Sequence, residues 1–166
     1  MLRRRSLLAL LLALPLAGCG FHLRTNNELP FKKLAVEGKD GPLMASLKRQ
    51  LAALGTQVVP RAQAQAVFTL LQDSSTQTPM AYNADGTVAQ YQLAIDLRYQ
   101  LATPEGDLLV QPTSLRQTSF LSYSTSATLA KADEADLLYR GMRQDLLSRI
   151  LFQLSVLHAP AATPSP

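Results

Sequence analysis

Histidine, cysteine and tryptophan are scarce in this chain: its 166 residues include two histidines, one cysteine and no tryptophan. A single cysteine excludes an internal disulfide and any metal site built from several cysteines. His22 and His158 lie outside every predicted helix and strand, where no scaffold would hold either imidazole as a general base. The sequence also lacks the common nucleophile, zinc-protease and phosphate-loop motifs. These absences argue against an enzyme and against a metal-dependent protein.

Long hydrophobic runs are also missing, apart from one near the start of the chain. Three arginines at 3–5 precede an apolar run at 6–17, which is shorter than the roughly 20 residues of a membrane-spanning helix. The run closes with Leu-Ala-Gly-Cys at 16–19, which resembles the lipobox of bacterial lipoproteins. We therefore expect residues 1–18 to be a cleaved signal peptide, with a diacylglycerol and an N-acyl chain on Cys19. The alternatives are an uncleaved anchor helix or a cleaved soluble precursor in which the cysteine is incidental.

Removal of the leader changes the charge of the protein. The full chain has 16 basic and 12 acidic residues, and loss of the three leader arginines leaves 13 against 12, a net charge of +1. A near-neutral chain has no general attraction for nucleic acid. Lipoproteins with aspartate after the lipidated cysteine tend to stay in the inner membrane, whereas Gly20 occupies that position here. By resemblance to this sorting pattern we expect the outer membrane, with residues 19–31 as a lipidated tether.

Residues 32–158 are predicted to form a single α/β domain. Residues 32–37 have the alternation of a short strand, and residues 42–54 repeat leucine at helical spacing after a proline suited to a first helical turn. Residues 66–71 are apolar on both faces, as in a central strand. They continue into a polar run at 74–78, so this strand is expected to extend past the core.

Two turns divide the next part of the chain into a three-stranded antiparallel meander. Asn-Ala-Asp-Gly at 83–86 and Pro-Glu-Gly-Asp at 104–107 have typical turn compositions. Between them, residues 90–101 alternate apolar and polar side chains, which predicts a long strand with one buried face. Its partner is expected at 108–123, where Pro112 requires a bulge or an edge position.

The last predicted element is a long helix. Asp133 followed by Asp136 resembles a capping box at its start, and an apolar stripe along 135–154 is typical of a helix that packs on a core. Arg143 is expected to face water. The proline-rich segment 159–166 is predicted to be a disordered tail.

The predicted order of elements is strand, helix, three strands, helix. Each helix has one apolar face, and so does the clearest strand. We therefore expect a two-layer α/β (α+β) sandwich with two helices on one face of a mixed four-stranded sheet.

Three short segments, taken together and in order, are similar to one family of bacterial lipoproteins. They are Cys-Gly-Phe-His-Leu-Arg at 19–24, Tyr-Gln-Leu at 91–93, and Leu-Ala-Lys-Ala-Asp-Glu-Ala-Asp at 129–136. The family is the lipopolysaccharide-assembly lipoprotein LptE, and the resemblance spans most of residues 19–157. It implies an α/β sandwich on an outer-membrane lipoprotein that binds lipopolysaccharide and lies largely inside a large β-barrel partner, LptD. It implies no cofactor or metal beyond the acyl chains on Cys19.

The resemblance also implies a cationic site for the phosphates of lipopolysaccharide. Lys131 matches a basic residue of the family, the alternative being a solvated loop lysine. The family can present a second basic residue in the turn before Tyr91, but residues 80–84 contain none. Arg98 or Arg116, on the polar face of the strands, would then have to replace it. For both arginines the alternative is a surface side chain that faces another strand or a partner.

Two other functions remain open from the residues alone. A stand-alone periplasm-facing scaffolding or lipid-binding lipoprotein would share the anchor and the sandwich without needing a barrel. A lipid-modifying hydrolase would need a nucleophile or base with a perturbed pKa in a cleft.

Overall fold

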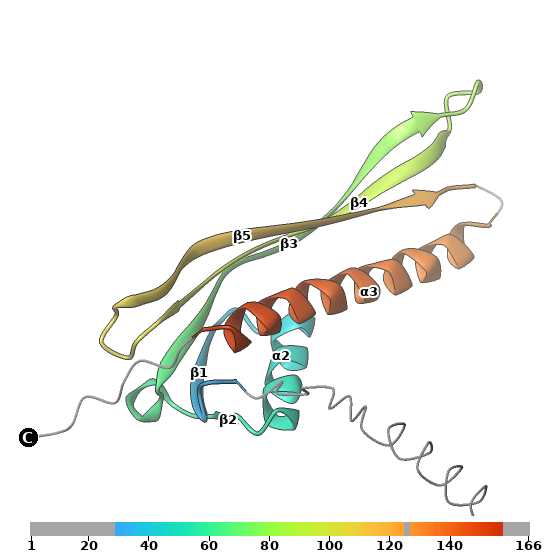
Figure 1. Ribbon diagram of the computed structural model, residues 1–166. Helices are drawn as coiled ribbons and strands as arrows, with labels where there is room; N and C mark the ends of the chain where they lie inside the picture. The colour runs from blue at the N-terminus through green and yellow to red at the C-terminus, as the bar shows by residue number, and fades with distance from the viewer. Residues whose placement is uncertain (1–28, 125–126, 158–166) are drawn as a thin grey trace, which may run out of the picture.

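The computed structural model describes residues 29–124 and 127–157 (Figure 1). The predicted signal peptide, the predicted lipidation site Cys19 and the predicted tail lie outside the described residues. The described elements, in chain order, are β1 (Lys33–Gly38), α2 (Pro42–Ala53), β2 (Gln57–Val58), a 3-10 turn η2 (Arg61–Gln63), β3 (Ala66–Tyr82), β4 (Val88–Ala102), β5 (Leu108–Ser122) and α3 (Thr128–Ser155).

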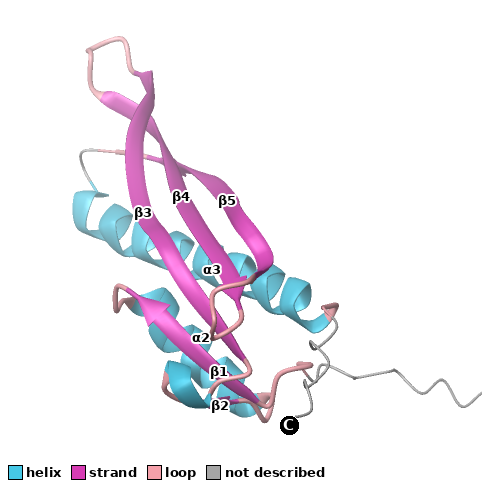
Figure 2. Cartoon of the chain, turned by 90° about the vertical axis from the view of Figure 1, so that its left-hand side faces the viewer, coloured by secondary structure: helices cyan, strands magenta, loops and turns pink. Residues whose placement is uncertain are grey.

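One sheet and one helical layer make up the described domain. The strands lie in the order β2-β1-β3-β4-β5, with β1 parallel to both of its neighbours and the remaining pairs antiparallel. Helices α2 and α3 lie on the same face of this sheet (Figure 2). The predicted two-layer sandwich and mixed sheet are therefore confirmed, and the core lies between the layers.

The predicted number of four strands is wrong, because β2 adds a fifth at the edge of the sheet. Gly55, with a φ of 78°, turns the chain after α2, and Gln57 then pairs with Lys33 in β1. The hydroxyl of Thr56 donates a 2.9 Å hydrogen bond to the carbonyl oxygen of Phe31. A strand of two residues has no periodicity that a sequence pattern could reveal.

The alternating segment in β4 has its predicted buried face. Leu93, Ile95, Leu97, Tyr99 and Leu101 are at most 1% exposed and pack with the apolar side chains of both helices. The domain also begins earlier than predicted. Two apolar residues of the predicted tether, Leu29 and Phe31, belong to this core.

Strand β3 extends past the core, as its polar second half predicts. After a register shift between Leu70 and Gln72, nearly all of its side chains are exposed, up to Tyr82. This part pairs with β4, and the two strands form a hairpin arm whose tip projects beyond the helices (Figure 1).

Pro112 satisfies both of the conditions predicted for it. Strand β5 is an edge strand, so the missing amide hydrogen of a proline breaks no pairing on the outer side. Val110 pairs with Leu101 and Thr113 with Tyr99, so two residues of β5 lie opposite one residue of β4. The proline therefore lies in a bulge.

The predicted start of α3 at Asp133 is wrong. The helix begins at Thr128 after Ala127, and no side chain caps it. Residues 128–132 include leucine, alanines and a lysine, which are strong helix formers and extend the helix by more than a turn. Asp133 and Asp136 are therefore exposed residues inside the helix rather than a capping box.

Candidate functional site

Over β3, β4 and β5, the sheet face that points away from α2 and α3 bears no α-helix among the described residues (Figures 1 and 2). Beyond Leu70 of β3 and along the paired parts of β4 and β5, its side chains are mostly polar. Because the apolar residues of β4 face the helices, the alternate residues face the opposite way. The strand register places hydroxyl and amide side chains beside them on β3 and β5. We call this surface the open face; it includes Ser74, Thr76, Thr78, Gln92, Asp96, Arg98, Gln100, Ser114, Arg116, Thr118 and Phe120.

Two of the predicted lipopolysaccharide contacts lie on the open face. Arg98 is exposed and pairs in register with Ser114, and Arg116 pairs with Asp96. The guanidinium of Arg116 lies 3.4 Å from the Asp96 carboxylate, with 61% of its side chain exposed. An exposed pair of this kind contributes at most about 1 kcal/mol, so it leaves Arg116 free to exchange partners.

The third predicted contact, Lys131, lies in the helical layer. Its ammonium is 2.7 Å from the Glu134 carboxylate one turn later, and 22% of its side chain is exposed. The sheet therefore separates Lys131 from Arg98 and Arg116. The structure brings the two arginines onto one surface and does not bring the lysine to them.

Helix α3 also supports the outer edge of β3. The hydroxyl of Tyr139 donates a 2.7 Å hydrogen bond to the carbonyl oxygen of Thr76, and the guanidinium of Arg143 donates a 3.0 Å bond to the hydroxyl of Ser75. Burial raises the pKa of Tyr139, against the opposing charge of Arg143, so the phenol stays protonated and remains a donor. Arg143 therefore reaches the sheet, and its predicted orientation toward water is wrong.

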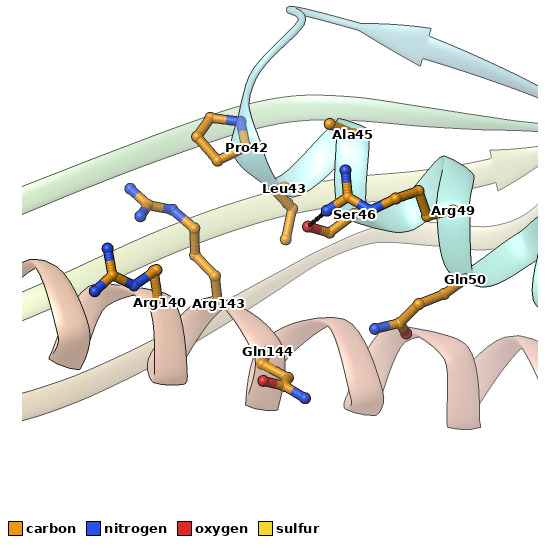
Figure 3. Close-up of a pocket in the computed structure, with 9 residues that line it drawn as sticks. All are labelled: Pro42, Leu43, Ala45, Ser46, Arg49, Gln50, Arg140, Arg143 and Gln144. Carbon is orange, nitrogen blue, oxygen red and sulfur yellow. Dashed lines mark hydrogen bonds between the residues drawn. The ribbon is translucent and has the colours of Figure 1, made fainter.

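A groove of about 500 Å³ separates the first turns of α2 from the middle of α3 (Figure 3). Arg49 of α2 and Arg140 and Arg143 of α3 line it, and the guanidinium of Arg49 donates a 2.9 Å hydrogen bond to Ser46. We call it the arginine groove. Sequence reasoning missed it because its two walls are far apart in the chain, and neither wall has a local motif.

The described residues include no metal cluster and no membrane-spanning helix. Among them, no three histidine, cysteine, aspartate or glutamate side chains gather in a way that could hold a metal ion. Neither described helix has both the length and the apolar character needed to cross a bilayer. The carboxyl pKa values that are shifted belong to Glu37 and Asp85, and hydrogen bonds from Arg61 and Thr87, respectively, lower them.

Comparison with known proteins agrees with this arrangement. The sequence profile of the family described as "LptE: Lipopolysaccharide-assembly" matches residues 31–154. The LPS-assembly lipoprotein LptE of Yersinia pestis (strain Pestoides F) is 32% identical over 165 residues, which cover 94% of this chain and 79% of the relative.

Two solved structures share the fold. The NMR structure of an uncharacterized lipoprotein B from Nitrosomonas europaea is 24% identical, covers 82% of this chain and 90% of its own, and has a TM-score of 0.72. The crystal structure of rare lipoprotein B from Shewanella oneidensis is also 24% identical, covers 74% of this chain and 92% of its own, and has a TM-score of 0.64.

The family comprises non-enzymatic lipoproteins of lipopolysaccharide assembly and has no known cofactor. Membership therefore confirms the interpretation as an assembly lipoprotein and contradicts the hydrolase alternative. From the match over most of the described domain and the 32% identity to a named relative, this chain belongs to the LptE lipopolysaccharide-assembly family.

Proposed function

We propose that this protein is a lipid-anchored outer-membrane lipoprotein that binds lipopolysaccharide and plugs a β-barrel partner, LptD, in the translocon that delivers lipopolysaccharide to the outer leaflet. The observation that carries the proposal is the open face. It is a polar sheet surface that α2 and α3 leave uncovered, whereas the opposite surface of β4 packs against both helices in the core.

The chemistry of the open face suits the interior of a barrel. Lumen-facing residues of outer-membrane barrels are polar. Hydroxyl and amide groups, such as those of Thr78, Gln92 and Thr118, can exchange water for hydrogen bonds with such a wall without the large cost of burying unpaired charges. Asp96 and Arg116 already form a pair, which reduces that cost further.

The three predicted cationic contacts lie on two different surfaces of the domain. Only 22% of the Lys131 side chain is exposed, and Glu134 holds its ammonium, so this group is positioned for a phosphate at the start of α3. Arg98 and Arg116 lie on the other side of the sheet, so one phosphate cannot meet all three residues. We propose Lys131 as the principal contact, with the two arginines facing either a second part of the ligand or the barrel wall.

The anchor completes the proposal. Acyl chains on Cys19 would hold the domain at the inner leaflet of the outer membrane, since two or more chains give stable attachment. The residues between Cys19 and Leu29 would connect the anchor to the buried start of the domain.

Charge reversal at Lys131 tests the ligand contact. A form that begins after Cys19 should bind lipopolysaccharide in a salt-dependent manner, because exposed charges are screened over about 8 Å at physiological salt. Lys131→Asp should weaken binding about tenfold or more, because it replaces a charge-assisted contact by a repulsion. Its melting temperature should change little, because the ion pair with Glu134 contributes about 0 to 1 kcal/mol. Lys33→Asp reverses a charge on β1, at the end of the sheet opposite to the start of α3, and should leave binding unchanged (Figure 1).

The ligand contact and the barrel plug are separate parts of this proposal, and each has a result that would contradict it. Undiminished binding by Lys131→Asp would remove the lysine from the site. Purification of the full lipoprotein from detergent-solubilised membranes tests the plug, since a much larger barrel should accompany both the wild type and Lys131→Asp. Recovery of the lipoprotein alone would favour the stand-alone scaffolding function.

A further inference from the structure

The arginine groove does not end at its cationic part. A second hollow of about 350 Å³ lies further along α2 and α3, and Gln50 lines both. Leu54, Leu151 and Phe152 line this second hollow. The space between the two helices is therefore cationic at one end and apolar at the other, with each part in the volume range of small-molecule sites.

The cationic end lacks compensating charge. No acidic side chain lines it, and Arg49, Arg140 and Arg143 form no ion pair with any described residue. The nearby Asp73 approaches Gly41, with its carboxylate 4.0 Å from where a Cβ at Gly41 would lie, yet it forms no ion pair with these arginines. Three guanidinium groups that form no ion pair with a described residue repel one another.

Arg143 gives a second, independent observation. Its Nε is buried and has no hydrogen-bond partner within the described structure. One of its two terminal nitrogens, Nη2, donates a hydrogen bond to Ser75. A buried donor without an acceptor costs about 1 to 3 kcal/mol, so an acceptor in this groove would be stabilising.

The apolar end is also incompletely covered. Phe152, which lines this hollow, is 70% exposed. Leu54 and Leu151 are only partly buried. A chain of methylene groups laid along these side chains would remove apolar surface from water on both partners.

We propose that the space between α2 and α3 is a binding site for an anionic lipid, with a phosphate head at Arg49, Arg140 and Arg143 and one acyl chain along Leu54, Leu151 and Phe152. Guanidinium groups bind phosphate oxygens in a bidentate manner, which suits the head. The site is separate from Lys131, which does not line either hollow.

Dodecyl phosphate is the probe, because it consists of only a phosphate head and one alkyl chain, the two groups that the site is proposed to bind. The full lipoprotein is kept in an uncharged detergent, and native mass spectrometry counts the probe molecules that stay bound. We expect one tightly bound dodecyl phosphate per chain, with inorganic phosphate competing only at far higher concentration. No retained probe on the wild-type protein would overturn the proposal.

Matched variants test the cationic end and the apolar end of the site separately. Combining Arg49→Gln with Arg140→Gln should weaken probe binding at least tenfold, whereas Lys33→Gln, which removes a charge outside the groove, should not. Phe152→Gln should weaken it severalfold, whereas Leu137→Gln, which removes an exposed leucine of α3 that lines neither hollow, should not. These substitutions leave Arg143 and its bond to Ser75 intact. Equal binding by the groove variants and their controls would refute the site.

Competition identifies the natural source of the lipid. Displacement of the probe by lysophosphatidylglycerol indicates a glycerophospholipid, displacement by lipopolysaccharide indicates that ligand, and displacement by neither would contradict a lipid site. Failure of this proposal and failure of the proposed function are distinguishable, because the groove is tested with dodecyl phosphate and groove variants, whereas the proposed function is tested at Lys131 and by co-purification of the barrel.

Discussion

Replacing Leu97 by aspartate would put a carboxyl group between the sheet and the helices. Leu97 is 1% exposed and lies on the helix-facing side of β4. Its neighbour in register on β3 is Asp73, so the new carboxylate would also face a like charge. On β5 its neighbour is Leu115, which offers no hydrogen bond.

The expected loss has two parts. Removal of a buried leucine side chain costs about 3 to 5 kcal/mol, most of it through lost packing. The carboxyl adds a pH-dependent part, because burial raises its pKa in the folded state while the unfolded chain keeps a pKa of about 3.9. The unfolded state therefore binds fewer protons above that pH, and each unit up to the folded pKa removes about 1.4 kcal/mol more. Against a typical stability of about 5 to 15 kcal/mol, the domain should be largely unfolded at neutral pH.

Urea and thermal unfolding of three variants measure these parts. Leu97→Ala should lose the packing part alone at every pH. Leu97→Asp should lose more, and the difference between the two should grow as the pH rises from about 4 to 7. Gln92→Asp puts the same carboxyl on the open face of the same strand and should cost no more than about 1 kcal/mol. Equal melting temperatures for the two aspartate variants would show that the faces of β4 are assigned wrongly.

Three further predictions concern other parts of the chain. Gly38→Ala should cost about 1 to 3 kcal/mol in urea denaturation, because Gly38 has a φ of 133° and an added Cβ would lie 2.7 Å from the carbonyl oxygen of Leu70; an unchanged midpoint would rule out this strain. Arg61 holds the pKa of Glu37 below its usual 4.5, so this carboxylate stabilises the fold above that pH and the benefit is lost as the pH falls through the lowered value. Glu37→Gln should therefore flatten the acid side of the stability curve, and an unaltered curve would contradict the pairing. Cys19→Ser, outside the described residues, should abolish metabolic labelling with a fatty acid, and label entering this variant would disprove the anchor.

The sequence predicted best where a pattern repeats over many residues. In β4 the alternation continues for the whole strand, so its existence and buried face follow from the residues alone. The polar second half of β3 likewise predicts its exposure past Leu70. Pro112 constrains its strand through the missing amide hydrogen, which is a local property that needs no tertiary information.

The sequence-based predictions are wrong where the pattern covers only a few residues or where tertiary contacts determine the local structure. Strand β2 has only two residues, Gln57 and Val58, so its sequence cannot show a period and does not predict a strand. Asp133 resembles a helix cap, yet the helix-forming residues before it continue the helix back to Thr128. The buried Phe31 follows a proline within a polar segment, and only its packing against the domain shows that it belongs to the core.

The candidate binding sites differ in the same way: a repeating pattern predicts some of their features, and tertiary contacts determine the rest. The polar strand face that carries Arg98 and Arg116 follows from alternation, whereas its separation from Lys131 depends on which side of the sheet α3 occupies. The arginine groove requires α2 and α3 to lie together, and no pairing of residues across such a distance in the chain is visible in one sequence.

Because the outer half of β3 lies in the hairpin arm, the two halves of this strand should open to solvent in different ways. Near Phe68 the strand is bonded on both sides, to β1 and β4, and is covered by the core. The pairing with β1 ends at Leu70, so beyond it β4 is the only described strand that pairs with β3, and α3 adds hydrogen bonds at Ser75 and Thr76. Met80, near the tip, is 52% exposed. Amide hydrogens near Phe68 should therefore exchange with solvent only when the whole domain unfolds, while those near Met80 exchange through brief fraying. A bend or a twist of the arm would cost little of the global unfolding free energy, so its tip can adjust to a neighbouring surface while the core stays rigid.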